Sequence, residues 1–121
     1  MAQGKEVNGW KLEPFGSCAS AQIDYARLNG ANLYAIDLRG AEMREVQLCG
    51  AHVAEARMAS ANLTGANLSG ANLSGTDLSR AILVGADLSG ANLRRANLSG
   101  ARMDGANING ARFCKTIMPD L

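Results

Sequence analysis

Residues 61–100 read ANLTG-ANLSG-ANLSG-TDLSR-AILVG-ADLSG-ANLRR-ANLSG, a run of consecutive five-residue blocks. The same register extends in both directions and gives nineteen blocks from Ala21 to Lys115, each centred on one large apolar residue. Twelve of the nineteen centres are Leu, sixteen blocks have Ala two positions before the centre, and eleven blocks end in Gly. Position classes that stay in register over this length indicate a repeat architecture.

A five-residue period matches neither the 3.6-residue period of an amphipathic helix nor the two-residue period of a continuous strand. Within one block, however, Ala, polar, Leu and polar residues alternate as they do in a short strand. The fifth residue is often Gly, which tolerates the positive φ angles of a tight corner. The sequence therefore predicts short extended segments joined by corners, with successive turns stacked as a solenoid.

The pattern Ala-(Asn or Asp)-Leu-x-x resembles that of the pentapeptide repeat family, and Ala61–Gly100 is close to the family consensus. The resemblance implies an all-β fold, a right-handed quadrilateral (square) β-helix solenoid with four pentapeptides in each coil. Nineteen blocks would then form about five coils. The segment TIMPD, which begins at Thr116, also resembles the endings of cyanobacterial members of the family.

We expect one domain, with an N-terminal cap segment at 1–20, the pentapeptide-repeat β-helix at 21–115 and a short C-terminal tail at 116–121. The first segment carries no repeat, and we expect Trp10 and Phe15 to lie over the first coil. Covering the end of a solenoid hides apolar side chains and unpaired strand edges. The alternative for this segment is a disordered tag.

With twenty residues in each coil, residues twenty positions apart lie one above another. The centres then form four interior columns, and the small Ala side chains leave room for the inward-facing Leu side chains. On the outside, Asp24 would pair with Arg44, and Asp37, Arg57 and Asp77 would form an alternating charged column. We expect Asn and Ser side chains to form hydrogen-bonded ladders along the stack.

The C-terminal end has a thinner cover than the N-terminal end. Pro119 cannot donate a backbone hydrogen bond, so it blunts the edge. Phe113, Met118 and Leu121 would leave an apolar end face, together with Ile117. Some family members dimerise through their C-terminal ends, so the resemblance implies a tail-to-tail homodimer. The alternative is a monomer in which Phe113 and Met118 plug the last coil.

Two groups of residues on the outer faces are candidate contact surfaces. Ile82 and Val84 flank Leu83 at outward positions and form a small apolar patch for a partner, or else they are ordinary strand-favouring residues on a β surface. Four basic residues also share one late face that could contact an acidic partner. These are Arg94, Arg95, Arg112 and Lys115.

Nothing in the pattern predicts catalysis, and we expect no enzyme activity, no cofactor and no metal site. His52 is the only histidine, and Cys18, Cys49 and Cys114 lack metal-like spacing and are expected to be free thiols. The formal net charge is +1 with charges of both signs interspersed, which argues against nucleic-acid binding. No stretch is apolar enough to span a membrane, and the absence of a visible targeting segment predicts a cytoplasmic location.

The resemblance favours a non-catalytic structural or protein-interaction module with an unidentified protein partner. One alternative is a DNA-mimic protein that interacts with gyrase, as some family members do, but this mimicry requires an acidic surface. Residues 21–115 contain eight acidic and ten basic residues. The other alternative is a regulator that binds one specific cellular protein.

Overall fold

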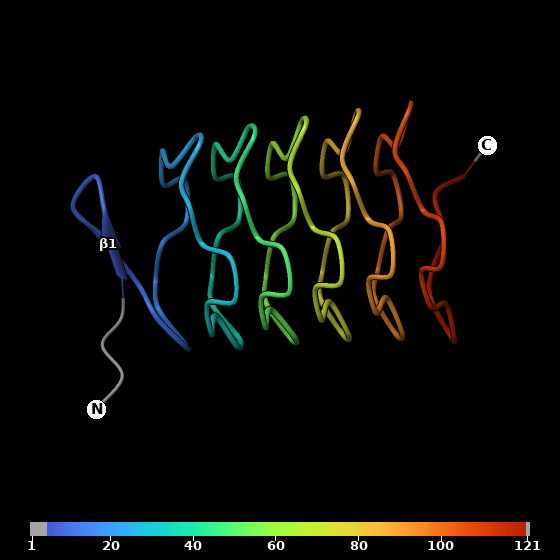
Figure 1. Cartoon of the computed structure of the whole chain (residues 1–121), viewed down its shortest axis with the longest axis horizontal. Helices are drawn as coiled ribbons and strands as arrows, with labels where there is room; N and C mark the ends of the chain where they lie inside the picture. The colour runs from blue at the N-terminus through green and yellow to red at the C-terminus, as the bar shows by residue number, and fades with distance from the viewer. Residues whose placement is uncertain (1–4, 121) are drawn as a thin grey trace.

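The computed structural model describes residues 5–120, which form a rod of stacked turns with a hairpin at its N-terminal end (Figure 1). The hairpin consists of β1 (Lys5–Val7) and β2 (Trp10–Leu12), which pair antiparallel with Lys5 opposite Leu12. Its two-residue turn is Asn8-Gly9, with φ angles of 52° and 82°. Asn-Gly favours such a turn because both central residues need positive φ.

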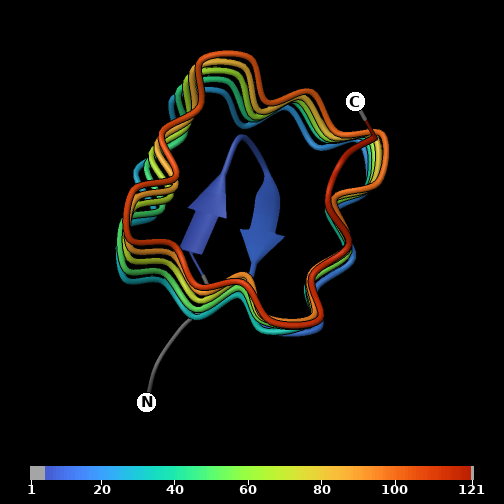
Figure 2. The same ribbon diagram turned by 90° about the vertical axis from the view of Figure 1, so that its right-hand side faces the viewer.

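After the hairpin, the backbone pairs in parallel through single residues rather than through longer strands. Each paired residue lies twenty positions from its partner, as in Gln22 with Glu42 and Glu42 with Asn62, and the pairs run from Ser17 to Ile117. One turn of the solenoid therefore takes twenty residues, and Figure 2 shows the turns superposed along the axis. The expected extended segments are too short to form regular strands because the chain bends every five residues.

The bends occur where the sequence predicts them. Every fifth residue from Phe15 to Lys115 has a φ angle between 55° and 72°, and eleven of these corner residues are Gly. The remaining ten carry side chains in a left-handed conformation that is unfavourable for residues with a Cβ atom. The corner geometry is thus imposed by the repeat even where the sequence does not supply Gly.

The polar residues on either side of a centre stabilise the corner within their own block. Asn67 Oδ1 accepts hydrogen bonds from the backbone N–H of Ser69 at 3.0 Å and from its hydroxyl at 2.7 Å. Asp87 and Ser89 form the same pair of bonds. The expected Asn and Ser ladders between coils are therefore wrong for these blocks, because the Asx turn keeps the side-chain oxygen within its own block. Bonds between coils occur at Asn29, whose Oδ1 accepts from the Cys49 N–H at 2.8 Å, and at Ser69, whose hydroxyl lies 3.3 Å from the Cys49 Sγ.

The interior is filled by the block centres and the small residues beside them. All centres from Ile23 to Leu98 are at most 2 % exposed. Thr76, which replaces Ala in its block, is also buried, and its Oγ1 donates a 2.8 Å hydrogen bond to the backbone oxygen of Val53. The Thr side chain is tolerated in the core because its hydroxyl has a partner.

The hairpin caps the N-terminal end of this core. Lys5 Nζ donates to the Arg27 carbonyl at 2.6 Å and Asn8 Nδ2 to the Gln22 carbonyl at 2.9 Å. Trp10 packs against the core, as predicted. The prediction for Phe15 is wrong: it is 72 % exposed, because it occupies an outward-facing corner. Residues 1–4 of the expected cap segment lie outside the described residues.

Candidate interaction surfaces

The C-terminal end of the interior is exposed to solvent. Ile108, Phe113 and Met118 are 42 %, 39 % and 44 % exposed, and Met103 is partly buried. These four residues are the last members of the four interior columns, so we call them the end face. Phe113 and Met118 therefore lie at the predicted end of the rod. Ile117, also predicted there, instead lies at an outward position where it pairs with Asn97, and Leu121 lies outside the described residues.

The end face also has an open backbone edge. In the earlier turns, the backbone N–H of each centre donates to the carbonyl nineteen residues later, as in Leu83 to Arg102 at 2.7 Å. Among residues 5–120, the backbone N–H groups of Met103, Ile108 and Phe113 donate no such bond. Edges of this kind are templates for pairing with another chain.

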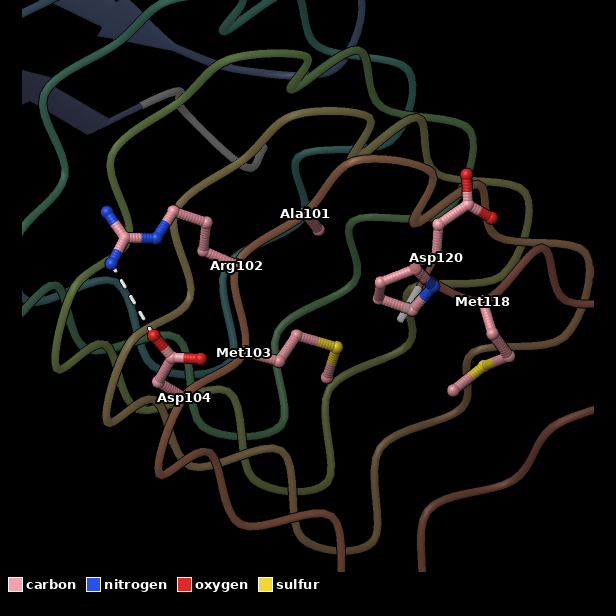
Figure 3. Close-up of a pocket in the computed structure, with 7 residues that line it drawn as sticks. Ala101, Arg102, Met103, Asp104, Met118 and Asp120 are labelled. Atoms are coloured by element: carbon pink, nitrogen blue, oxygen red, sulfur yellow. Dashed lines mark hydrogen bonds and ion pairs between the residues drawn. The ribbon is translucent and has the colours of Figure 1, made fainter.

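A hollow of about 510 Å³ opens on the end face (Figure 3). Met103 and Met118 provide apolar lining, and Pro119 closes one side. Arg102 and Asp104 lie at the rim and form an exposed ion pair of 3.4 Å. Met side chains adapt their shape readily, so this hollow suits an apolar side chain of another protein.

The four predicted basic residues do share one face. Asn32, His52, Asn72, Asn92 and Arg112 pair in sequence along it. Arg94 and Arg95 follow Asn92, and the Arg95 N–H donates to the Cys114 carbonyl, next to Lys115. All four basic side chains are exposed. Arg95 forms an ion pair with Glu55 at 3.9 Å. Within the described part of the chain, Arg94, Arg112 and Lys115 form no ion pair.

An aromatic cluster that the sequence analysis missed lies on the same face. Phe15 and Tyr34 meet edge to face with ring centroids 5.5 Å apart, and Tyr34 lies 5.6 Å from the His52 ring. The twenty-residue turn could have revealed it, because Phe15 and Tyr34 are nineteen residues apart and Tyr34 and His52 eighteen. We call the aromatic–basic face the surface formed by Phe15, Tyr34, His52, Glu55, Arg94, Arg95, Arg112 and Lys115.

Ile82 and Val84 lie on a different face and are half-buried. Ile82 pairs with Asn62 in the turn before it and with Arg102 in the turn after it. The two side chains are therefore partly covered by their neighbours. The exposed apolar area of this patch is therefore smaller than the outward register positions of Ile82 and Val84 predict.

The predicted ion pairs are confirmed in one case and wrong in another. Arg44 lies 2.7 Å from Asp24 in the turn before it. Asp37, by contrast, pairs with Arg39 of its own block at 2.6 Å rather than with Arg57. Hydrogen bonds from these two arginines hold the pKa of Asp24 and the pKa of Asp37 below their usual value.

The remaining chemical groups are dispersed. The three cysteines are free thiols, as predicted; Cys18 is buried, and Cys49 and Cys114 are exposed. Burial raises the pKa of the Cys18 thiol. Within residues 5–120, no group of three or more His, Cys, Asp or Glu side chains could hold a metal ion. The same residues contain no helix with the length and apolar character needed to cross a bilayer.

The repeat pattern, the twenty-residue turn and the buried centres together define a pentapeptide repeat solenoid. The family pattern, described as pentapeptide repeats, matches in eight copies over residues 17–53, 41–80 and 81–118. The chain belongs to the pentapeptide repeat family, whose members are right-handed β-helices and generally non-catalytic repeat proteins. A search of curated proteins found no match.

Solved structures of several family members are similar to this chain. A pentapeptide repeat protein from Nostoc PCC 7120 is 37 % identical with a TM-score of 0.52, over 82 % of this chain and 74 % of that protein. One from the Arabidopsis thaliana thylakoid lumen is 31 % identical with a TM-score of 0.50, over 83 % and 66 %. HetL, involved in heterocyst differentiation regulation in Nostoc sp. strain PCC 7120, is 32 % identical with a TM-score of 0.50, over 86 % and 58 %.

Proposed function

We propose that this chain is a non-catalytic protein-interaction module and that it binds protein through its end face. The observation that carries the proposal is the contrast between the two ends of the core. The hairpin covers the N-terminal end, whereas Ile108, Phe113 and Met118 are exposed at the other end. Exposed apolar side chains next to an open sheet edge are typical of an interaction surface.

A second copy of the chain is the first candidate for the occupant. The hairpin obstructs head-to-tail stacking, so two copies would meet through their C-terminal ends around a two-fold axis, which gives a closed dimer. The rim supports this arrangement because it carries charges of both signs, Arg102 beside Asp104. A two-fold axis would bring each charge near its opposite on the other copy.

Sedimentation velocity over a range of concentrations tests the dimer. The parent chain should shift from monomer to dimer as its concentration rises into the high micromolar range. Ile108→Asn/Met118→Asn should remain monomeric because it makes the end face polar. The matched control, Ile82→Asn/Val84→Asn on a lateral face, should associate like the parent. If the parent chain stays monomeric at high micromolar concentration, a second copy is excluded as the occupant of the end face.

A different protein is the alternative occupant of the end face. Affinity capture from the source organism, with the parent and with Ile108→Asn/Met118→Asn, tests this alternative. A partner recovered by the parent and lost with the variant would support it, and the Ile82→Asn/Val84→Asn chain shows whether the lateral patch contributes. The interaction proposal fails if the parent is monomeric and captures no partner above the level of the variant.

Two narrower roles remain as alternatives within this proposal. A regulator of one cellular protein is favoured by the similarity to HetL, whose described role is in heterocyst differentiation regulation. A DNA-mimic protein that interacts with gyrase is disfavoured, because the repeats carry eight acidic against ten basic residues and a DNA mimic needs a negative surface. Inhibition of gyrase supercoiling at stoichiometric levels would reverse this preference.

We also infer that the solenoid has four sides and about five coils. The twenty-residue offset between paired residues supports this shape, since a corner recurs every five residues and four corners therefore complete one turn. We propose a cytoplasmic location, because three free cysteines suit a reducing compartment.

A further inference from the structure

The aromatic–basic face differs from the rest of the rod in charge. It carries four basic side chains and one acidic side chain, Glu55, an excess of three positive charges on a chain whose formal net charge is +1. Arg94, Arg112 and Lys115 do not take part in the ion pairs among residues 5–120. The rest of the chain therefore carries a small net negative charge, and the net positive charge of the chain lies on this face.

The corner residues on this face also differ from those elsewhere. One corner column consists entirely of Gly, from Gly30 to Gly110 at twenty-residue intervals. On the aromatic–basic face, Gly75 is the single glycine of the corner column, and the other corners have side chains at positive φ. These residues are Phe15, Ala35, Glu55, Arg95 and Lys115. A side chain at such a backbone position is unfavourable for the fold, so its presence suggests another role.

The aromatic and the basic parts of this face are separated along the axis of the solenoid. The aromatic cluster spans the first turns, whereas Arg94 and Arg112 lie two and three turns beyond His52 along the same face. At a spacing of about 4.8 Å for each turn, His52 and Arg112 are roughly 14 Å apart along the axis. An extended peptide covers that distance with about four residues.

We propose that the aromatic–basic face binds an extended acidic segment of another protein. Carboxylates of the segment contact Arg94, Arg112 and Lys115, and an aromatic side chain packs on Phe15 and Tyr34. Arginine pairs favourably with carboxylates, and aromatic side chains pack well edge to face. The inference rests on the proposed protein-interaction function but places a second partner on a lateral face, separate from the end face.

Fluorescence anisotropy with a synthetic peptide tests the inference. The probe is a peptide of about twelve residues, with one Trp near its N-terminus followed by alternating Glu and Ser. Three further probes are the same peptide with Lys for Glu, the same peptide with Ser for Trp, and an oligothymidine of about fifteen nucleotides. The first peptide should bind the parent chain most tightly, and its affinity should fall as salt is raised.

Variants of the face locate the binding. Arg94→Ser/Arg112→Ser should weaken the acidic peptide by about tenfold or more, because it removes both charge partners. Phe15→Ser should weaken the Trp peptide but not the peptide that lacks Trp. Glu55→Gln should tighten binding, because it removes the acidic group of this face. The matched control, Arg57→Ser/Arg80→Ser on a neighbouring face, should leave the affinity within about twofold.

Several results would overturn the inference. The first is that the acidic peptide does not bind the parent chain at about millimolar concentration. The second is that Arg57→Ser/Arg80→Ser loses as much affinity as Arg94→Ser/Arg112→Ser. The third is that oligothymidine binds the same residues more tightly than the acidic peptide does. Ile108→Asn/Met118→Asn separates this inference from the proposed function, because it should abolish association through the end face and leave peptide affinity unchanged. If the parent chain associates through its end face but does not bind the acidic peptide, the lateral binding surface is refuted and the proposed function is not.

Discussion

Glu55 and Arg95 form an ion pair of 3.9 Å although they lie two turns apart on the solenoid. Gly75 occupies the corner between them, and its missing side chain leaves room for the Glu55 carboxylate to lie against its backbone. The twenty-residue turn explains the relationship, because residues 55, 75 and 95 are stacked in one corner column. An ion pair can thus span a whole turn where that turn has Gly at the corner.

Gly75→Ala should be more destabilising than Gly85→Ala. A Cβ atom at either position is unfavourable at φ angles of 68° and 69°, which costs roughly 1–2 kcal/mol. At Gly75 the new atom would also displace the Glu55 carboxylate, whereas nothing lies within 4 Å of a Cβ at Gly85. Urea unfolding of the two variants measures the difference. The extra loss at Gly75 should be small, about 0.2–1 kcal/mol, because the flexible Glu55 side chain can move aside and only its exposed pair with Arg95 is weakened. Equal losses of stability would show that this ion pair does not stabilise the fold.

Substitutions in the interior should destabilise the fold whether they make a buried side chain smaller or larger. Leu73→Ala should lower the free energy of unfolding by about 2–5 kcal/mol, because Leu73 is fully buried between the turns. Ala66→Leu should lower it by about 1–3 kcal/mol, because this buried position has no room for a larger side chain. Thermal or urea melts that match the parent would contradict the packed interior.

The Asp24–Arg44 pair should make stability depend on pH. A hydrogen bond from Arg44 lowers the pKa of Asp24 in the folded chain, so the pair stabilises the fold above the unfolded pKa of about 3.9. That contribution is lost as the pH falls through the lower folded pKa. Arg44→Gln should therefore be less stable than the parent at pH 7, and the two unfolding free energies should converge in strong acid. Arg27→Gln, which removes a charge outside the described ion pairs, serves as the control. A difference in unfolding free energy between Arg44→Gln and the parent that persists in strong acid would contradict the prediction.

The cysteines should differ in their reactivity towards a thiol reagent such as DTNB. Cys49 and Cys114 are exposed and should react in the folded chain, whereas Cys18 is buried, with its Sγ 3.4 Å from the Lys11 carbonyl of β2. Burial also raises the pKa of Cys18, which lowers its thiolate fraction. We expect two thiols to react at once and the third after unfolding. Immediate reaction of all three would show that the hairpin does not seal the N-terminal end.

The sequence predicts the regular part of the fold because each block has one residue for each structural requirement. The centres, the small flanking residues and the corners all lie where the five-residue register places them. The local hydrogen bonds were harder to predict, since Asn67 could bond either to the next turn or to Ser69. The shorter loop within the block prevails, because the Asn side chain already lies next to that N–H.

The candidate surfaces were predictable in part. Phe113 and Met118 at the end face, and the four basic residues on one face, follow from the twenty-residue turn. An aromatic residue near a solenoid end suggests burial in the cap, but the corner position of Phe15 points its side chain outward. Contacts such as Phe15 with Tyr34 depend on side-chain rotamers as well as register, so the repeat pattern alone does not specify them.

The most direct test of the end-face proposal is a pulsed electron–electron distance measurement with a nitroxide on Cys114 in a Cys49→Ser chain. Two copies joined by their end faces should give one distance below about 40 Å, because Cys114 lies in the last turn. With the label on Cys49 in a Cys114→Ser chain, the distance should be longer by roughly 25–30 Å, because that residue lies three turns further from the end. The absence of dipolar coupling from Cys114 at high micromolar concentration, or a shorter distance from Cys49 than from Cys114, would contradict association through the end face.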